Sequence, residues 1–366
     1  MKKISLLTSL LLSCSMAFSQ SALLDLSGTW RFQTDMMGFG KTPGSELSRA
    51  KLAESIQLPG STDEAGVGIK VNARYLDRLT RKFEYCGAAW YQREVTIPES
   101  WSEKEITLML ERCHWETTVY VDGKLVGMEE HLITPNRFNL TQYLTPGIHV
   151  LTLCIDNRLK YPMDHWNHGT TEHTQTNWNG VVGQMRLEAR DKINILSMQA
   201  YPDIENKNVR LQFDWANTTG AACNGEVELV LSEKNGKSIA TTTLPVELPE
   251  KGGKFTTTLS LGKNMKLWDE FTPNLYKVKA TLRAGSLQDS RNVTFGMRKV
   301  EQGKHHIRLN NRNIHLRGAL DCCVFPLTGY PATTVGEWKR IFTIVKDYGL
   351  NHVRFHSWCP PKAAFI

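Results

Sequence analysis

The sequence has little of the patterning that marks helical, membrane-spanning or nucleic-acid-binding proteins. Before residue 334 there is almost no helical periodicity, which argues against a helical bundle. After the first 20 residues no run is apolar enough to cross a membrane. The formal charge is +7, but Lys and Arg are interleaved with acids and form no run or stripe. We therefore expect no nucleic-acid partner and no transmembrane segment.

Cysteine is also used sparsely, with eight residues scattered over 366 positions. There is no CxxC and no Cys/His spacing typical of a metal site, and the framework of a disulfide-stapled mini-domain is absent. Cys322 and Cys323 are adjacent, but a disulfide between neighbours closes only a strained ring. The sequence thus favours cysteines that pack as small buried side chains, with no cofactor and no metal.

The first residues carry an export signal. Lys2 and Lys3 precede an apolar run from residue 4 to 18, and Ala17-Phe18-Ser19 is a small-x-small cleavage site before Gln20. We expect residues 1–19 to be a signal peptide and the mature chain to be secreted or periplasmic. The alternative is an outer-surface lipoprotein attached through Cys14, which the serine before that cysteine disfavours.

Short alternating runs typical of strands fill the chain from Leu26 to Arg190. Val119 and Val121 share one face of such a run, which turns at Asp122-Gly123, a strong hairpin signal. Strands at this spacing predict a β-sandwich of the jelly-roll type for residues 20–190.

A second all-β segment is expected over residues 191–298. Leu211, Phe213 and Trp215 alternate with polar residues, and a later run ends in an Asn235-Gly236 turn. About seven short strands in roughly 105 residues fit an immunoglobulin-like sandwich. The segment lacks the Cys…Trp…Cys pattern of antibody domains.

The pattern changes after residue 298. A hairpin is expected to turn at Asn310-Asn311, and then Thr334 and Glu337 form a capping box that opens a helix ending at Gly349. The run "NHVRF" that follows is predicted to be a buried strand. Strand, helix, strand is the opening of a βα-repeat, and about 60 residues are too few for a complete (β/α)8 TIM barrel. We therefore expect residues 299–366 to be the truncated start of such a barrel.

Seven collinear motifs resemble glycoside hydrolase family two, which includes β-galactosidases, β-glucuronidases and β-mannosidases. The resemblance covers nearly all of the mature chain and implies a galactose-binding-like jelly roll, an immunoglobulin-like domain and a barrel. The motifs are "LSGTWRF" from residue 26, "WYQR" from 90, "VYVDGKLVG" from 119, "FNLTQYLTPGIHVLTL" from 138, "WNGV" from 178, "TPNLY" from 272 with "FGMR" from 295, and "NNRNIHLRG" from 310 with "LNHVRFHSW" from 350.

The chemistry that this resemblance implies is retaining hydrolysis by two glutamates. In the family both lie on later barrel strands, and no Glu of this chain matches either motif. We expect no catalytic residue within the 366 residues. Glu337 is the last glutamate, and its place in the capping box explains it structurally.

Substrate positioning is the function expected of the residues that end the predicted barrel strands. Arg354 and His356 stand where the family usually has Arg-x-Ser-His, so the residue that takes the histidine's role is left open. Arg354 could hold an active-site carboxylate and His356 a sugar hydroxyl; the alternatives are a structural ion pair and a packing imidazole. Asp321 could bind sugar hydroxyls or close an Asx turn.

The segment from Tyr161 to Gly180 is the most polar and aromatic loop in the chain. In the family the corresponding loop reaches the barrel mouth, which makes Asn177 a candidate contact for the terminal sugar. Trp178 could stack on that sugar or serve as the sandwich's buried anchor. His165, His168 and His173 could suggest zinc, but the loop is not rich in carboxylates, and a solvated polar loop is favoured.

Three functions fit these features. The first is the front part of an exported exoglycosidase that acts on an oligo- or polysaccharide. We expect this part to be inactive in isolation, and an oligomer of the full-length parent is left open. The second is a non-catalytic, lectin-like carbohydrate-binding protein, and the third is a surface adhesin. The strand–helix–strand pattern after residue 298 favours the first, because neither of the others needs it.

Overall fold

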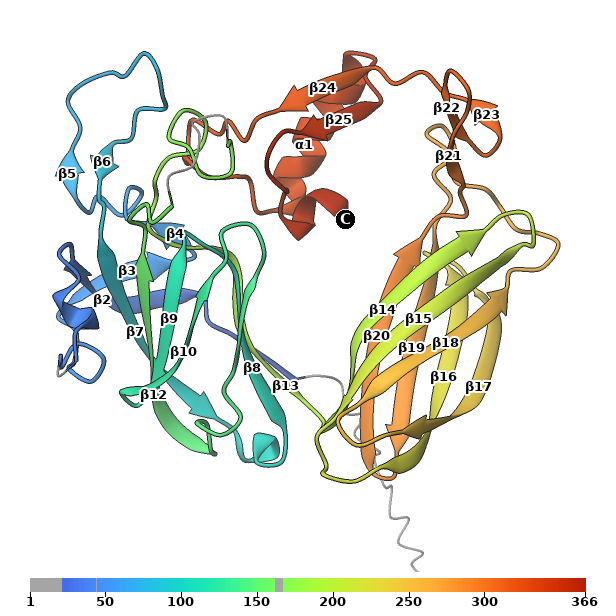
Figure 1. Cartoon of the computed structure of the whole chain (residues 1–366), viewed down its shortest axis with the longest axis horizontal. Helices are drawn as coiled ribbons and strands as arrows, with labels where there is room; N and C mark the ends of the chain where they lie inside the picture. The colour runs from blue at the N-terminus through green and yellow to red at the C-terminus, as the bar shows by residue number, and fades with distance from the viewer. Residues whose placement is uncertain (1–21, 44, 162–166) are drawn as a thin grey trace, which may run out of the picture.

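The computed structural model describes residues 22–43, 45–161 and 167–366. It is mainly β, with two sandwiches followed by a small unit that contains the single α-helix among the described residues (Figure 1). The predicted signal peptide lies outside the described residues. None of the helices described is long and apolar enough to span a bilayer.

The first sandwich packs a five-stranded sheet against a six-stranded sheet. The five-stranded sheet has β1 (Ala22–Asp25), β13 (Gly180–Arg190), β8 (Glu105–Cys113) and β11 (Asn136–Asn139), with β4 (Gly60–Ser61) also paired to β13. The six-stranded sheet has, in spatial order, β10 (Lys124–Glu130), β9 (Glu116–Val121), β12 (Gly147–Asp156), β7 (Ala88–Ile97), β2 (Gly28–Asp35) and β3 (Glu54–Leu58). A separate ribbon pairs β5 (Ile69–Lys70) with β6 (Phe83–Glu84), and short 3-10 turns lie at η1 (Phe39–Lys41) and η2 (Glu99–Trp101).

The core of this sandwich comes from the inward positions of the alternating runs. Trp30, Phe32 and Val119 are fully buried within one cluster shared by both sheets. The predicted hairpin is confirmed, since β9 and β10 meet across Asp122 and Gly123, whose φ angles are 50° and 74°. Positive φ at both central positions is the backbone that a two-residue turn between twisted strands requires.

The second sandwich has seven strands, the number expected from the sequence. A three-stranded sheet contains β14 (Ile193–Asp203), β15 (Asn208–Asn217) and β18 (Gly253–Ser260), and a four-stranded sheet contains β17 (Ser238–Leu248), β16 (Cys223–Glu233), β19 (Tyr276–Ala284) and β20 (Leu287–Phe295). The predicted alternation holds, because Leu211, Phe213 and Trp215 all lie in the core cluster.

The C-terminal unit begins with a small antiparallel sheet of β21 (Val300–Gln302), β22 (Ile307–Leu309) and β23 (Arg312–Asn313). The predicted turn is confirmed, with Asn310 and Asn311 both at positive φ between β22 and β23. Next come β24 (Gly318–Asp321), α1 (Val335–Asp347), β25 (His352–Phe355) and η3 (Lys362–Phe365), and β24 pairs with β25 in parallel.

The helix begins and ends as the sequence predicts. The Thr334 hydroxyl accepts from the Glu337 amide, the Glu337 carboxylate accepts from the Thr334 amide, and Gly349 follows the helix at a φ of 73°. The unit is therefore a parallel βαβ motif. That it opens a (β/α)8 barrel stays a prediction.

The expectation of a buried second strand is wrong. In β25, His352 and Arg354 are exposed, and Val353 and Phe355 are only half-buried. The physical reason is that, among the residues described, β24 is the only strand paired with β25 and one face of the pair is uncovered. Leu320, beside Arg354 in register, is 57% exposed. An apolar run predicts a strand but does not say how many neighbours cover it.

Candidate functional site

The polar loop that follows β12 is held at both ends by one side chain. The carboxamide nitrogen of Asn157, which is buried, donates to the backbone oxygens of Asn177 (3.0 Å), Trp178 (3.3 Å) and Tyr85 (2.9 Å). Its oxygen accepts from the Gly87 amide at 2.8 Å. Because one amide group joins the start of the loop to its end, the loop base is fixed to the sandwich whatever the tip does.

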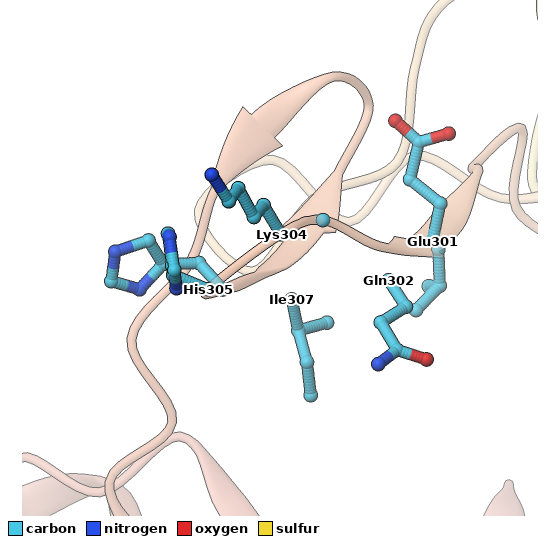
Figure 2. A pocket seen from close by; sticks show the side chains of 8 residues that line it. Glu301, Gln302, Lys304, His305 and Ile307 are labelled. Atoms are coloured by element: carbon cyan, nitrogen blue, oxygen red, sulfur yellow. The ribbon is translucent and has the colours of Figure 1, made fainter.

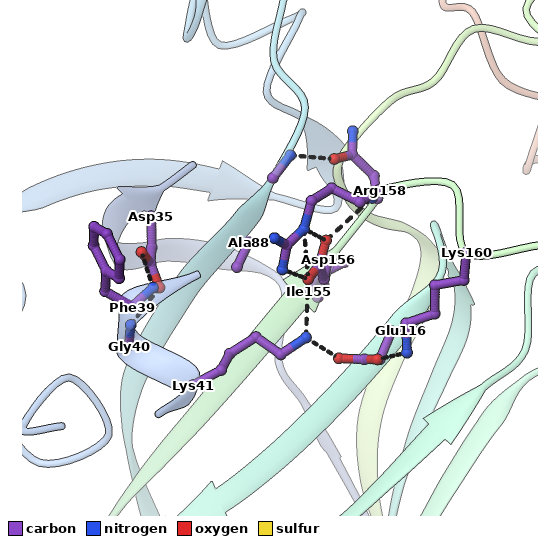
Figure 3. A network of polar contacts seen from close by, with 12 residues as sticks. Asp35, Phe39, Gly40, Lys41, Ala88, Glu116, Ile155, Asp156, Arg158 and Lys160 are labelled. Carbon is purple, nitrogen blue, oxygen red and sulfur yellow. Dashed lines mark hydrogen bonds and ion pairs between the residues drawn. The ribbon is translucent and has the colours of Figure 1, made fainter. Parts of the chain in front are cut away.

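A buried ionic network lies next to this base. Figure 3 shows Lys41 between Asp156 and Glu116, with the Arg158 guanidinium on Asp156 and Lys160 on Glu116. Burial raises the pKa of Asp156, but hydrogen bonds from Arg158 and Lys41 outweigh it and lower that pKa to about 2. Each of the two buried carboxylates is paired with two cations. We therefore expect the network to fix the conformation of the backbone that follows β12.

The far part of the loop docks on the C-terminal unit. The Thr176 amide donates to the Gly329 oxygen at 2.9 Å, and the Cys323 thiol lies 3.8 Å from the Gln175 carboxamide oxygen. Arg112 on β8 adds a third contact, donating to the Cys359 oxygen at 2.8 Å. These contacts join residues about 150 and 250 positions apart in the sequence. The loop of the first sandwich therefore lies beside the C-terminal unit (Figure 1).

Two of the predicted site residues meet at the ends of the parallel strands. The His356 amide donates to the Asp321 backbone oxygen at 2.8 Å, immediately after β24 and β25 end. One carboxylate oxygen of Asp321 accepts from the Cys323 amide at 2.8 Å, which is the Asx turn foreseen as an alternative. Burial raises the pKa of Asp321, and that hydrogen bond only partly offsets it.

The loop brings His168 against His356. Their ring centroids are 4.7 Å apart at an interplanar angle of 55°. His168 is buried, at 8% exposed, and its Nδ1 has no hydrogen-bond partner among the described residues. Burial, and then the neighbouring His356, lower the pKa of His168. This contact joins the first sandwich to the strand ends.

Asn177 lines a different place. It borders a polar cleft of about 480 Å³ on the first sandwich, together with Arg81, Cys86, Trp115 and Glu172. Its carboxamide nitrogen lies 3.7 Å from the Cys86 sulfur. Asp321, Arg354 and His356 do not line this cleft, so the structure does not gather the predicted site residues into one cavity.

Trp178 packs inside the protein. It is 1% exposed, between His114 and Tyr330 at centroid distances of 5.3 and 5.6 Å. Because the indole is buried among protein side chains, it has the place of the sandwich's buried anchor and is not open to a sugar.

Arg354 is exposed on the open face of β25. No ion pair to it is found within the parts of the chain that the structure describes, so the alternative of a structural Arg–acid pair is not seen there.

Two further features do not join this site. A cavity of about 560 Å³ lies along β21 and β22 and is lined only by residues 300–307. Figure 2 shows Glu301, Lys304 and His305 around it. Of the loop histidines considered for zinc, His165 lies outside the described residues, and His173 Nδ1 is 2.6 Å from the Asp77 oxygen.

Sequence reasoning missed the docking residues Gln175, Thr176 and Gly329 and the meeting of His168 with Cys322 and His356. No local pattern marks these contacts, because each joins segments about 150 residues apart. Only the glycine at 329 is visible in the sequence. The structure shows why glycine suits this position: its φ is 77° and a Cβ there would meet Thr176.

Two sandwiches followed by a parallel βαβ unit, with a loop of the first sandwich docked beside the strand ends, define a modular protein. The chain belongs to glycosyl hydrolase family 2: the model of that family's sugar-binding domain matches residues 23–186, and the model described as glycosyl hydrolases family 2 matches residues 193–298.

Relatives agree with this assignment. The β-galactosidase of Thermoanaerobacterium thermosulfurigenes is 21% identical over 338 residues, which cover 91% of this chain and 45% of that protein. A β-glucuronidase of Formosa agariphila is 22% identical over 297 residues, covering 74% of this chain and 30% of that protein. The crystal structure of Bacteroides uniformis β-glucuronidase superposes with a TM-score of 0.74 at 21% identity, covering 94% of this chain and 40% of the other. The chain thus spans less than half the length of each of these relatives, and at these identities the structural likeness shows the fold.

Proposed function

We propose that this chain is the front, substrate-positioning part of an exported retaining exo-glycoside hydrolase that acts on the non-reducing end of a glycan. Membership of glycosyl hydrolase family 2 supports the reaction class. The observation that carries the proposal is the docking of the sandwich loop beside the strand ends, through Thr176 and Gly329. A loop that closes over one side of a barrel mouth leaves room for a chain end rather than for the middle of a polymer.

The isolated chain should not hydrolyse glycosides. Retaining hydrolysis needs two carboxyl groups about 5–5.5 Å apart, one as acid/base and one as nucleophile. The carboxylate of Glu337, the last glutamate in the sequence, accepts from both the amide and the hydroxyl of Thr334 and so serves the helix cap. We therefore place both catalytic glutamates on strands outside these 366 residues.

We propose positioning roles for five residues of this chain. His356, half-buried at the strand end, can hydrogen-bond a sugar hydroxyl, and the second oxygen of Asp321 can accept from another. Arg354, exposed on the face of the β24–β25 pair, can orient a carboxylate from a later strand. Asn177 borders the cleft on the sandwich side, and the buried ring of Trp178 supports the loop from below.

Export is part of the same proposal. The amino-terminal signal predicted for residues 1–19 would deliver the enzyme to the periplasm or the medium, where glycans are available. An oligo- or polysaccharide is the partner. An oligomer of the full-length parent is compatible with this proposal.

The reaction class is tested with nitrophenyl β-glucuronide and nitrophenyl β-galactoside. We expect no turnover by the 366-residue chain and turnover by a protein extended through the downstream reading frame. In the extended protein, His356→Gln should raise KM, whereas the control His352→Gln, exposed on the same strand, should not. Hydrolysis by the 366-residue chain alone would contradict the assignment of both glutamates to later strands.

A further inference from the structure

Three side chains that can ligate metals converge where the loop meets the strand ends. His168 comes from the loop of the first sandwich, Cys322 follows β24 and His356 follows β25. One ligand atom of each lies within 4.8 Å of the others. Residues separated by more than 150 positions in the sequence thus form a three-sided cluster.

The donor atoms have lone pairs to offer. Nδ1 of His168 is buried without a partner among the described residues, and an unpartnered buried nitrogen costs free energy. Nδ1 of His356 lies 3.3 Å from the Ser357 hydroxyl. A histidine ligand usually has its second nitrogen hydrogen-bonded in this way, which fixes the ring and leaves Nε2 for the ion.

The donor set selects the class of ion. Two imidazoles and one thiolate suit zinc and neighbouring transition metals, whereas calcium and magnesium require oxygen ligands. In a tetrahedral zinc site the ligand atoms are roughly 3.3–3.8 Å apart, as bonds of about 2.0–2.3 Å dictate. From a separation of 4.8 Å the ligand atoms would have to approach by about 1–1.5 Å, which small rotations of the three side chains can supply.

We propose that His168, Cys322 and His356 bind a zinc-class transition-metal ion that fastens the loop of the first sandwich to the strand ends of the C-terminal unit. The thiol of Cys322 releases its proton to solvent as the metal–sulfur bond forms, and neither the metal nor the protein changes oxidation state. Three protein ligands leave the fourth position for water. The proposal does not rest on hydrolase activity, because all three ligands belong to this chain. With the ion bound, both ring nitrogens of His356 are occupied, so a metal ligand is an alternative to the sugar contact proposed above for that residue.

This site differs from the one considered from the sequence, which would have used three histidines of one loop. Only His168 of those three takes part. The ion would strengthen a junction that already exists through Thr176 and Arg112, so the fold of each sandwich should not depend on it.

The test uses the 366-residue chain, Zn2+ and Co2+, with Ca2+ as the control ion. Calorimetric titration after chelator treatment should give one Zn2+ site and no Ca2+ site at these residues. Co2+ should produce a thiolate-to-metal charge-transfer band in the near ultraviolet. His168→Gln, His356→Gln and Cys322→Ser should each weaken Zn2+ binding roughly a hundredfold or more. The matched controls His352→Gln and Cys359→Ser, from the same unit, should bind as the unchanged chain does.

A second readout needs no variant and so cannot be confused with misfolding. Zn2+ should protect Cys322 from alkylation by iodoacetamide, while Cys86 and Cys359, both exposed, react equally with and without the ion. Binding that persists unchanged in all three ligand variants, a Co2+ spectrum without the thiolate band, or alkylation of Cys322 that ignores Zn2+ would overturn the proposal. In that case the two imidazoles simply pack together.

Discussion

The two sandwiches and the C-terminal unit are built from the same kinds of residues but differ in how completely they are covered. Each sandwich encloses a core with more than twenty buried hydrophobic side chains. The C-terminal unit has a cluster of only five, centred on Trp338, and leaves Leu320, Leu327 and Tyr348 more than half exposed. The sandwiches therefore supply most of the stability of the chain, whereas the stability of the C-terminal unit depends on the contacts that cover its apolar side chains.

The largest expected effect comes from a matched pair of tryptophans. Trp30 and Trp338 are both buried, and each indole nitrogen donates to a backbone oxygen, of Leu26 and Ala332 respectively. Replacing either with Ala should cost about 3–5 kcal/mol of local stability. Trp30→Ala should lower the main thermal transition, measured by circular dichroism.

Trp338→Ala should instead leave that transition in place and open residues 299–366 to limited proteolysis. A main transition lowered equally by both variants would show that the three parts unfold as one.

The junction between the regions is the next target. Gly329 has a φ of 77°, and a Cβ there would lie 2.3 Å from the Thr176 hydroxyl oxygen. Gly329→Ala should cost about 2–3 kcal/mol through strain and collision, seen as faster amide exchange in residues 167–177 and 323–330.

Gly349→Ala is the control for that variant. Its φ is 73°, but nothing lies within 4 Å of the added carbon, so it should cost only about 1 kcal/mol. Equal exchange in the two variants would mean that the loop does not depend on this contact.

Acid should affect the stability of the first sandwich and of the C-terminal unit in opposite directions. The pKa of Asp156 is lowered to about 2 in the fold, against 3.8 for the free group. The resulting stability is present above pH 3.8 and is lost as pH falls towards 2. It amounts to at most about 2 kcal/mol, since partly hydrated Lys41 and Arg158 screen the pair. Asp156→Asn should flatten the acid limb of the pH–stability curve.

Asp321 behaves in the opposite way. Burial raises its pKa above 3.8, so the folded C-terminal unit binds the proton more tightly than the unfolded chain does. Its contribution favours folding at low pH and declines as pH rises through the folded pKa. Amide exchange in β24, compared between the unchanged chain and Asp321→Asn, should show this slope. A slope of the same sign as in the first sandwich would contradict the assignment.

The smallest effect is expected at the helix cap. Thr334→Ala removes the hydroxyl that accepts from the Glu337 amide and should cost about 1 kcal/mol. The measurement is exchange in the first turn of α1. Thr333→Ala, one residue earlier, is the control and should change that exchange little.

Local chemistry explains which parts of this fold could be predicted from the sequence. The Asp122-Gly123 hairpin, the seven strands of the second sandwich and the capping box at Thr334 all depend on neighbours within a few residues. The burial of β25 was predicted wrongly, because coverage of a strand depends on partners that its own residues do not encode. The convergence of His168 with Cys322 and His356 could not be predicted, since no periodicity links a loop to strand ends 150 residues away.

The Asn157 side chain has a consequence for how such proteins diversify. Its carboxamide ties the entry and the exit of the loop together at the sandwich surface. Insertions, deletions and substitutions between those two points leave the sheets beneath undisturbed. We therefore expect changes in this loop to act on its contacts with the C-terminal unit, through Gln175 and Thr176, more than on the sandwich itself.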